Sequence, residues 1–319
     1  MNTVLVTGGA GFIGSHLVEA LVKEGTAVRV LDDLSTGSLE YLAGVRSQIE
    51  LIRGDVADMA VVRRATAGVS HVIHLAAMRS IPRSLDDPAL CNQVNVAGTL
   101  NVFLATREVR AQRVVFASSS AVYGDVETYP VSEDHPTHPL TPYAVTKLVG
   151  ELYARMFREI NGSSIVCLRY FNVYGPRMDA TSQYAMAVPR FIACLLNDLP
   201  PPVFGDGRQS RDFTCIDNVV HATRKALYAP DMGPDILNVG DGREYSVLDL
   251  VAILNRLMGK QIAPRHLPAI PGESRRTLAD IARAKQSLQY EPQVGFEEGL
   301  AKTIEWFRQH PVSPSVPTA

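Results

Sequence analysis

Tyr143 and Lys147 are the residues whose types and spacing best suit acid–base chemistry. They lie four residues apart in the segment Pro142-Tyr143-Ala144-Val145-Thr146-Lys147, so on a helix both side chains lie on one face. A neighbouring ammonium group favours the phenolate, and we expect it to lower the pKa of Tyr143 towards neutrality. The same spacing occurs on helices where both side chains are simply solvated. The pair therefore gains meaning only from the elements that position it.

A glycine-rich turn near the amino terminus indicates a dinucleotide site. A strand-like run at 3–7 leads into Gly8, Gly11 and Gly14, and an amphipathic helix follows. Glycines here permit a tight turn, approach of a pyrophosphate to the backbone, and close packing of helix on strand. The N–H groups at the start of the helix can bind phosphate. The spacing is G-x-x-G-x-x-G rather than the commonest G-x-G-x-x-G.

The second predicted strand supports this interpretation. It covers 27–31 and ends in Asp32-Asp33. A carboxylate at that position accepts both hydroxyls of an adenosine ribose and repels a 2′-phosphate. No arginine directly follows Asp32, so the sequence favours NAD over NADP. The alternative is that Asp32 only caps a helix or lies in a loop.

Composition excludes several classes of function. The 319 residues are 46% hydrophobic and 20% charged with a net charge of −2, which offers no general attraction for nucleic acid or anionic membrane. Four widely spaced cysteines argue against a zinc site and a disulfide framework and suit a reducing cytosol. No apolar run approaches the ~20 residues of a membrane span. We therefore expect a cytoplasmic protein without a metal or a membrane segment, and with a disordered tail at 311–319.

The order of apolar runs predicts an α/β fold. Strand-like Val/Ile/Leu runs alternate with helix-like stretches up to about residue 170, as in a parallel sheet covered on both faces. The predicted strands lie near 3–7, 27–31, 50–52, 71–75, 113–118, 164–170 and 236–240, and the predicted helices near 92–110, 143–160 and 247–258. We expect a doubly wound Rossmann domain over 1–175 to which 214–258 returns. The segments 176–213 and 259–310 would form a smaller substrate-binding lobe.

Many short motifs, taken in order, resemble one known family. They are Thr7-Gly8-Gly9-Ala10-Gly11-Phe12-Ile13-Gly14, Asp32-Asp33-Leu34, Gly54-Asp55-Val56, His74-Leu75-Ala76-Ala77, Asn95-Val96-Ala97-Gly98-Thr99, Ser118-Ser119-Ser120-Ala121-Val122-Tyr123-Gly124, Tyr143 with Lys147, Arg169-Tyr170-Phe171-Asn172-Val173-Tyr174-Gly175-Pro176-Arg177, and Gly205-Asp206-Gly207 with Ser210-Arg211-Asp212-Phe213. The chain resembles the extended short-chain dehydrogenase/reductases, and within them the nucleotide-sugar 4-epimerases. The resemblance covers nearly the whole chain.

The resemblance implies a set of reacting and cofactor-binding residues. Tyr143 would take the proton from the sugar 4-hydroxyl, Lys147 would lower the pKa of Tyr143 and hold the nicotinamide ribose, and Ser119 would hydrogen-bond the same sugar oxygen. Hydride would leave carbon 4 for NAD and return to the other face of the 4-keto sugar. The implied NAD contacts are Gly8, Gly11, Phe12, Ile13, Gly14, Asp32, Asp33, Leu34, Ser35, Thr36, Gly37, Asp55, Val56, Leu75, Ala76, Ala77, Asn95, Tyr143, Lys147 and Tyr170.

Residues beside Ser119 discriminate among relatives. Nucleotide-sugar 4,6-dehydratases carry an Asp-Glu pair after the catalytic residue, and UDP-glucuronate decarboxylases carry a Glu two residues before the tyrosine of this motif. Here those positions are Ser120 and Ala121, which cannot do acid–base work at a second carbon. Simple 4-epimerisation is favoured, while decarboxylation is excluded less firmly than elimination. Ser118 fits a structural role better than a catalytic one.

Substrate contacts are also implied by the resemblance. Asn172 would contact the diphosphate, and Arg211 the diphosphate or the uridine ribose. Glu273 would hold the uridine ribose, and Thr277 would limit the size of the sugar 2-substituent. The implied substrate set is Arg79, Ser119, Ser120, Tyr143, Asn172, Arg211, Glu273 and Thr277. A small Thr277 leaves room for an N-acetyl group, so UDP-N-acetylglucosamine is expected beside UDP-glucose. UDP-glucuronate stays open, because Thr181, Arg79 and Arg83 could face a carboxylate.

Two alternatives concern partners and class. The long helices near 92–110 and 143–160 match those that pair in family dimers, which predicts a homodimer. The apolar residues available are Val94, Leu100, Val102, Phe103, Leu104, Leu148, Leu152 and Met156, unless these face only the chain's own sheet. A non-catalytic NAD-binding regulatory module is the alternative of a different class, but it would have little need for Ser119, Tyr143 and Lys147 together.

Overall fold

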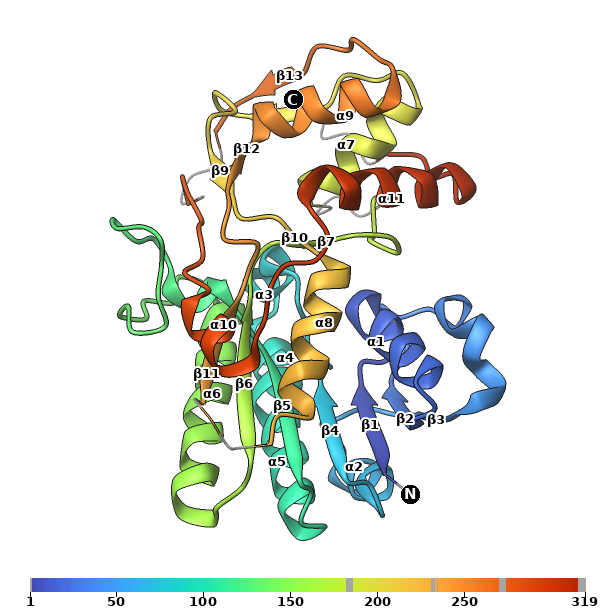
Figure 1. Cartoon of the computed structure of the whole chain (residues 1–319), viewed down its shortest axis with the longest axis vertical. Helices are drawn as coiled ribbons and strands as arrows, with labels where there is room; N and C mark the ends of the chain where they lie inside the picture. The colour runs from blue at the N-terminus through green and yellow to red at the C-terminus, as the bar shows by residue number, and fades with distance from the viewer. Residues whose placement is uncertain (1, 182–185, 231–232, 234, 270–273, 315–319) are drawn as a thin grey trace.

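A single twisted parallel sheet forms the centre of the molecule (Figure 1). The computed structural model describes residues 2–181, 186–230, 233, 235–269 and 274–314. Within them the main sheet has the strand order β11-β6-β5-β4-β1-β2-β3. Its strands are β1 (Thr3–Thr7), β2 (Ala27–Asp32), β3 (Ile49–Arg53), β4 (His71–His74), β5 (Arg113–Ser119), β6 (Ile165–Tyr170) and β11 (Ile236–Val239). All seven predicted strands are confirmed.

Helices cover both faces of this sheet because its strands are apolar on both sides. One face carries α1 (Phe12–Lys23) and α8 (Ile216–Leu227), which contact each other. The other face carries α2 (Met59–Thr66), α5 (Gly98–Glu108) and α6 (Pro142–Asn161). The order in which strands and helices alternate is that of a doubly wound Rossmann fold, so the predicted fold class is confirmed.

The two predicted long helices are present with some internal detail. The helix expected near 143–160 is α6, in which the Thr141 hydroxyl accepts from Ala144 N (3.3 Å) and the left-handed Gly162 ends the last turn. The helix expected near 92–110 is a run of pieces. The pieces within that range are a π-helical turn (Gln93–Ala97) and α5, and they are preceded by two short helices, α3 (Ile81–Asp86) and α4 (Pro88–Asn92).

A smaller lobe lies above the carboxyl ends of the strands (Figure 1). Its helices α7 (Ala187–Leu196), α9 (Val247–Met258) and α11 (Phe296–Gln309) contact one another. Short strand pairs accompany these helices between the lobe and the sheet. The short helix α10 (Ala282–Leu288) packs beside β11. The strand pairs are β8 (Pro202–Phe204) with β13 (Arg265–Leu267), β9 (Ser210–Arg211) with β12 (Tyr245–Ser246), and β7 (Val173–Tyr174) with β10 (Thr214–Cys215).

The domain division remains a prediction, and the contacts of helix α9 bear on one of its boundaries. β11 and α8 lie on the main sheet, in keeping with a return of 214–258 to the first domain. Helix α9 covers the expected range, and its N-cap Ser246 forms a capping box with Asp249. However, α9 packs on α7 and α11, so its contacts favour placing it with the smaller lobe. Of the tail at 311–319, residues 315–319 lie outside the described residues.

Candidate functional site

The glycine turn is shaped so that only backbone fits in it. Gly8 has a φ of +69°, and a Cβ there would lie 2.8 Å from the backbone N of Ala76. A Cβ on Gly14 would lie 2.1 Å from the main-chain oxygen of Gly8. Helix α1 begins directly after Gly11. Because glycine has no side chain, it offers no side-chain acceptor to the N–H groups of the first helical turn. Uncapped N–H groups beside a space without side chains fit a pyrophosphate.

Asp32 lies beside this turn at the end of β2. One carboxylate oxygen accepts from Ala10 N (2.9 Å) and the other from Leu34 N (2.8 Å). Burial raises the pKa of Asp32, and these two hydrogen bonds oppose that rise. Each oxygen keeps further lone pairs that can accept hydroxyl groups. In the loop that follows, a Cβ on Gly37 would meet Ala10, so the predicted ribose-binding segment closes onto the glycine turn and fits NAD.

The end of β4 forms the other wall of the turn. The Thr7 hydroxyl pairs with His74 Nδ1 (2.7 Å) and accepts from Leu75 N (3.2 Å), which fixes the start of the predicted NAD-facing run Leu75–Ala77. Asn95 is buried behind it. Its amide bonds both main-chain groups of Met78 (2.7 and 3.1 Å). Asn95 therefore shapes this loop through hydrogen bonds to other residues of the protein.

Lys147 is the buried cation of the site, with 4% of its surface exposed. Its Nζ donates to Ala117 O at 2.6 Å and lies 5.0 Å from the centre of the Phe116 ring and 5.9 Å from that of Tyr143. Burial lowers the pKa of Lys147 to about 8, while Cys91 and Glu151 act to raise it. The ammonium group is thus held at the carboxyl end of β5, one turn of α6 after Tyr143.

The pKa of Tyr143 differs from the sequence-based expectation. Burial raises it, and a side-chain hydrogen bond with Ser119 and the positive charge of Arg79 lower it only in part. Lys147 is not among these influences, since its ammonium group is directed at the carbonyl of Ala117. In the protein alone, the lysine therefore does not bring the tyrosine pKa towards neutrality, and desolvation is the larger effect.

Ser118 and Ser119 separate into two roles at the end of β5. Ser119 Oγ accepts from Ala121 N (3.2 Å) and interacts with Tyr143. Ser118 is buried and donates to Glu151 Oε1 at 2.5 Å. The assignment of Ser119 rather than Ser118 to the reacting group agrees with this geometry. Ser120 begins the short 3-10 turn that follows.

The predicted substrate residues meet above the carboxyl end of β6. Asn172, with a φ of 23°, donates from Nδ2 to Asp212 O (3.2 Å) and to Thr277 Oγ1 (2.9 Å). Arg211 is half-buried and donates to Ser210 O (2.8 Å). Glu273 lies outside the described residues. Asn172, Arg211 and Thr277 come from three distant segments, yet the structure brings them into one cluster.

Asp212 is a site residue whose importance the sequence analysis missed. Its buried carboxylate accepts from the backbone N–H groups of Asp241 (2.7 Å), Gly242 (3.1 Å) and Ala279 (3.1 Å). Burial raises the pKa of Asp212 to about 7 against these bonds. In the sequence Asp212 stands between Arg211 and Phe213 in a mixed polar stretch, so no local pattern signals this role.

Some predicted contacts lie at the margin of the site or inside the protein. The Tyr170 hydroxyl forms a hydrogen bond with Thr223 Oγ1 (2.8 Å) in the core. Tyr170 can therefore contact a cofactor only through its main chain. The carboxylates of Asp33 and Asp55 accept from Ser35 N (2.9 Å) and Ala57 N (2.8 Å), respectively. The remaining predicted NAD residues border the same turn and strand ends. They are Phe12 and Ile13 at the start of α1, Thr36 after Ser35, Val56 after β3, and Ala77 after β4.

Arginines at the open side could meet a negative group. Arg79 and Arg83 are exposed, and Arg79 influences Tyr143. Thr181 is exposed too, and its hydroxyl donates to Asp179 Oδ1 (2.8 Å). Across the described ranges, no cluster of three or more His, Cys, Asp or Glu side chains suits a metal ion. Nor does any described helix have the length and apolar character to cross a membrane.

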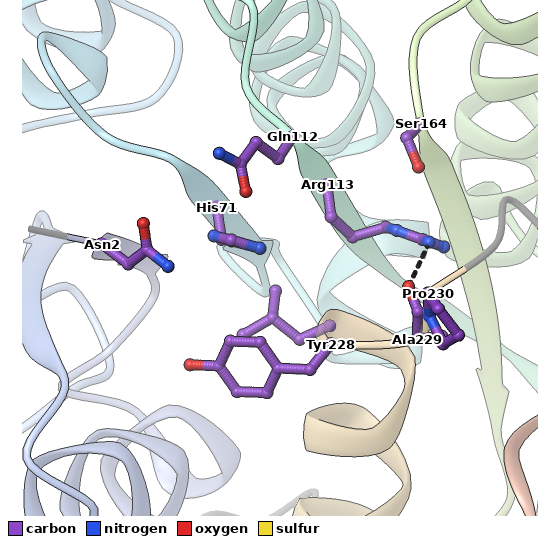
Figure 2. Close-up of a pocket in the computed structure, with 9 residues that line it drawn as sticks. Asn2, His71, Gln112, Arg113, Ser164, Tyr228, Ala229 and Pro230 are labelled. Atoms are coloured by element: carbon purple, nitrogen blue, oxygen red, sulfur yellow. Dashed lines mark hydrogen bonds between the residues drawn. The ribbon is translucent and has the colours of Figure 1, made fainter.

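A separate hollow of about 410 Å³ lies at the amino-terminal ends of the strands, opposite the site (Figure 2). It is lined by the first residues of β4 and β5, His71 and Arg113, and by Tyr228 after α8. Arg113 donates to Ala229 O (2.8 Å), two residues after the end of α8. Ligands of doubly wound sheets bind at the carboxyl ends of the strands, so this hollow is not part of the site.

Comparisons with known proteins agree with this geometry. The sequence pattern of the NAD dependent epimerase/dehydratase family matches residues 4–240. The chain is 39% identical over 308 residues to the UDP-glucose 4-epimerase of Mycolicibacterium smegmatis. The alignment covers 95% of this chain and 98% of that protein.

Two solved structures are similar over nearly their whole length. The UDP-N-acetylglucosamine 4-epimerase from Methanobrevibacter ruminantium, in complex with UDP-N-acetylmuramic acid, superposes with a TM-score of 0.93 at 36% identity, over 97% of this chain and 99% of that one. The UDP-glucuronic acid 4-epimerase from Bacillus cereus, in complex with UDP-glucuronic acid and NAD, gives a TM-score of 0.89 at 34% identity, with the same coverage.

Proposed function

The chain belongs to the NAD dependent epimerase/dehydratase family, and we propose that it interconverts UDP-glucose with UDP-galactose and UDP-N-acetylglucosamine with UDP-N-acetylgalactosamine. It is a UDP-sugar 4-epimerase that uses NAD, and the resemblance seen in the sequence is confirmed. One observation carries the proposal: Ser119, Tyr143 and Lys147 meet at the carboxyl end of β5, while Ser120 and Ala121 supply no second acid.

The reacting residues have distinct tasks in this proposal. Tyr143 takes the proton from the 4-hydroxyl and later returns it, and Ser119 hydrogen-bonds the same sugar oxygen. Lys147 provides a fixed positive charge in a buried setting, where charges act strongly. Bound NAD supplies the hydride chemistry at carbon 4. Gly8, Gly11, Gly14 and Asp32 would hold the NAD. This assignment is supported by the absence of side chains in the glycine turn and by the two backbone hydrogen bonds that fix the Asp32 carboxylate.

Substrate choice depends on the cluster at Asn172. Asn172 and Arg211 would bind the diphosphate, since amide and guanidinium groups donate to phosphate oxygens. Thr277 is small and held against Asn172, which supports room for an N-acetyl group at carbon 2. A second candidate is UDP-glucuronate, favoured by the exposed Arg79, which acts on Tyr143, and by the similarity to glucuronate 4-epimerases.

Incubation with a panel of UDP-sugars tests the function directly. The purified protein, without added reductant, should convert UDP-glucose and UDP-N-acetylglucosamine into mixtures with their 4-epimers, as followed by NMR. Tyr143→Phe should lower kcat by about a hundredfold or more, because it removes the general base. Tyr153→Phe, on the same helix α6, is the matched control and should retain activity. Normal turnover by Tyr143→Phe would refute the proposed base.

We further propose a homodimer through the outer side of α3, α4 and α6. Large apolar side chains are exposed there, with Leu85 at 59%, Val145 at 45% and Leu152 at 55%. Of the residues expected to supply this contact, Val102 and Phe103 are instead fully buried against the chain's own sheet. Leu152→Glu should turn a dimer into a monomer in light scattering, whereas a wild-type monomer at micromolar concentration contradicts the proposal.

A further inference from the structure

The reactive face of α6 continues one turn beyond Lys147 to Glu151. Tyr143, Lys147 and Glu151 are spaced four residues apart and so lie along one side of the helix. Glu151 is buried and receives two parallel hydrogen bonds from Arg169, at 2.9 Å from Nε and 2.7 Å from Nη2. Both side chains are 3% exposed. Ser118 adds a third bond to the same carboxylate at 2.5 Å.

This carboxylate joins the elements that carry the proposed reacting residues. Arg169 on β6 is the register partner of Ser118 on β5. Its guanidinium lies over the ring of Tyr123, 4.6 Å from the centroid, in the turn that follows Ser119. Glu151 therefore ties α6 to the strand end before Ser119, and through Arg169 to the turn after it.

Stability alone does not account for such a pair. A buried ion pair gives up the hydration of both ions, and apolar side chains of similar volume often serve stability equally well. What a bidentate Arg–carboxylate pair provides is fixed geometry. The position of this pair, directly beneath the reacting residues, points to a role in the reaction.

The charges around Lys147 single out Glu151. From the surrounding elements, the titratable groups that face Lys147 are Tyr143 and Glu151 on α6, Cys91 on α4, Cys167 on β6 and His74 on β4. Burial raises the pKa of the tyrosine and of both thiols and lowers the pKa of the histidine to about 3, so all four are neutral near pH 7. Within the described residues, Glu151 is the carboxyl group of this set, and it is paired with the guanidinium of Arg169.

We propose that Glu151 is a positioning residue for the epimerase reaction: fixed by Arg169 and Ser118, its carboxylate keeps the Lys147 ammonium charged and holds the end of β5 so that Ser119 meets Tyr143. This inference rests on the proposed function, because it assigns Glu151 a task through the residues of that same site. It also makes a statement about Lys147 that does not require sugar turnover.

NMR of the lysine side chains tests that statement. The chain has six lysines, of which Lys147 is the buried one, so ¹³Cε-labelled protein gives a simple spectrum, assigned with Lys147→Met. Glu151→Gln should lower the titration midpoint of Lys147 by about one pH unit, the effect of removing a close opposite charge. Glu159→Gln removes an exposed carboxylate from the same helix and should leave the midpoint unchanged.

The pH profile of kcat separates positioning from mere loss of structure. With a midpoint near 8 in the wild type, a one-unit decrease reduces the charged fraction of Lys147 about fivefold at pH 8 but by only about a quarter at pH 6.5. Glu151→Gln should therefore be close to wild type at pH 6.5 and lose about fivefold of kcat at pH 8. A purely structural defect would lower activity at both pH values alike.

A double variant keeps the test decisive if Glu151→Gln does not fold. Glu151→Leu with Arg169→Met replaces the ion pair by apolar groups and should fold with an unfolding midpoint close to wild type. It should still lower the Lys147 midpoint, but by less than Glu151→Gln, because the positive charge of Arg169 is lost as well. A wild-type Lys147 titration in the variants, or a lowered midpoint without any change in the pH profile of kcat, would overturn the proposal. If the wild type converts no UDP-sugar, the proposed function fails, while the NMR titration still decides the link between Glu151 and Lys147.

Discussion

His74 should make the stability of this protein fall in mild acid. The side chain is fully buried between two hydroxyl groups, with Nδ1 paired to Thr7 Oγ1 (2.7 Å) and Nε2 to Thr99 Oγ1 (2.9 Å). Burial, with a smaller effect of Lys147, lowers its pKa from 6.5 to about 3. In the unfolded chain the imidazole regains its ordinary pKa, so the unfolded state binds the extra proton first.

The size of the effect follows from the two pKa values. Below pH 6.5 the unfolded state holds one more proton at this residue, so the free energy of unfolding falls by about 1.4 kcal/mol per pH unit until the folded-state pKa near 3 is reached. Between pH 7 and pH 4.5 the loss amounts to about 2.5 kcal/mol. Asp212 acts in the opposite direction, because its raised pKa stabilises the folded state as the pH falls below 7. The wild-type curve alone therefore does not isolate His74.

Comparison of His74→Gln with the wild type isolates it. Urea unfolding followed by circular dichroism should show that the free energy of unfolding of the variant is lower than that of the wild type by about 1–3 kcal/mol at pH 7, since buried hydrogen bonds are lost. Between pH 7 and pH 4.5 this difference should shift by about 2.5 kcal/mol in favour of the variant, because only the wild type carries the imidazole. Thr99→Val breaks one of the same bonds but keeps the imidazole, so it should be destabilised with the wild-type pH dependence. An equal pH dependence of His74→Gln and wild type would refute the reasoning.

Two further predictions concern the cofactor and substrate ends of the site. Gly14→Ala places a Cβ 2.1 Å from a main-chain oxygen of the turn, so we expect NAD affinity in calorimetry to fall by about a hundredfold or more together with a lower unfolding midpoint. Gly44→Ala, where a Cβ meets open space, should change neither quantity. Thr277→Tyr fills the space beside Asn172 and should abolish turnover of UDP-N-acetylglucosamine while sparing UDP-glucose, whereas Thr277→Ser keeps the hydroxyl that Asn172 bonds and should turn over both. Equal loss of both sugars in Thr277→Tyr would contradict the assignment of Thr277.

The sheet could be predicted from the sequence because each of its strands is a local signal. Runs such as 113–118 and 164–170 are apolar on both sides of the chain, and that pattern alone places them in a covered parallel sheet. The glycine turn and Asp32 were predictable for the same reason, since the order of strand, turn and helix fixes which side chains reach the strand ends. Ser246 marked the start of α9 through its capping pattern.

What the sequence left undecided depends on contacts between distant residues. The pKa of Tyr143 is set by burial under the folded chain, which a spacing of four residues does not reveal. Val102 and Phe103 are apolar residues of a helix expected at the dimer interface, but they are buried against the sheet. The carboxylates of Asp212 and Glu151 appear as ordinary acids in the sequence, and only the backbone groups and the guanidinium they meet give them their importance.

The distribution of the site along the chain has a consequence for biosynthesis. The residues expected to contact the cofactor lie no later than Tyr170, the last residue of β6, whereas the expected substrate cluster depends on Asp212, whose carboxylate is bound by Asp241 and Ala279. A chain emerging from the ribosome thus completes the dinucleotide cradle more than a hundred residues before it can close the substrate cluster. Cofactor capture can precede, and template, the docking of the smaller lobe.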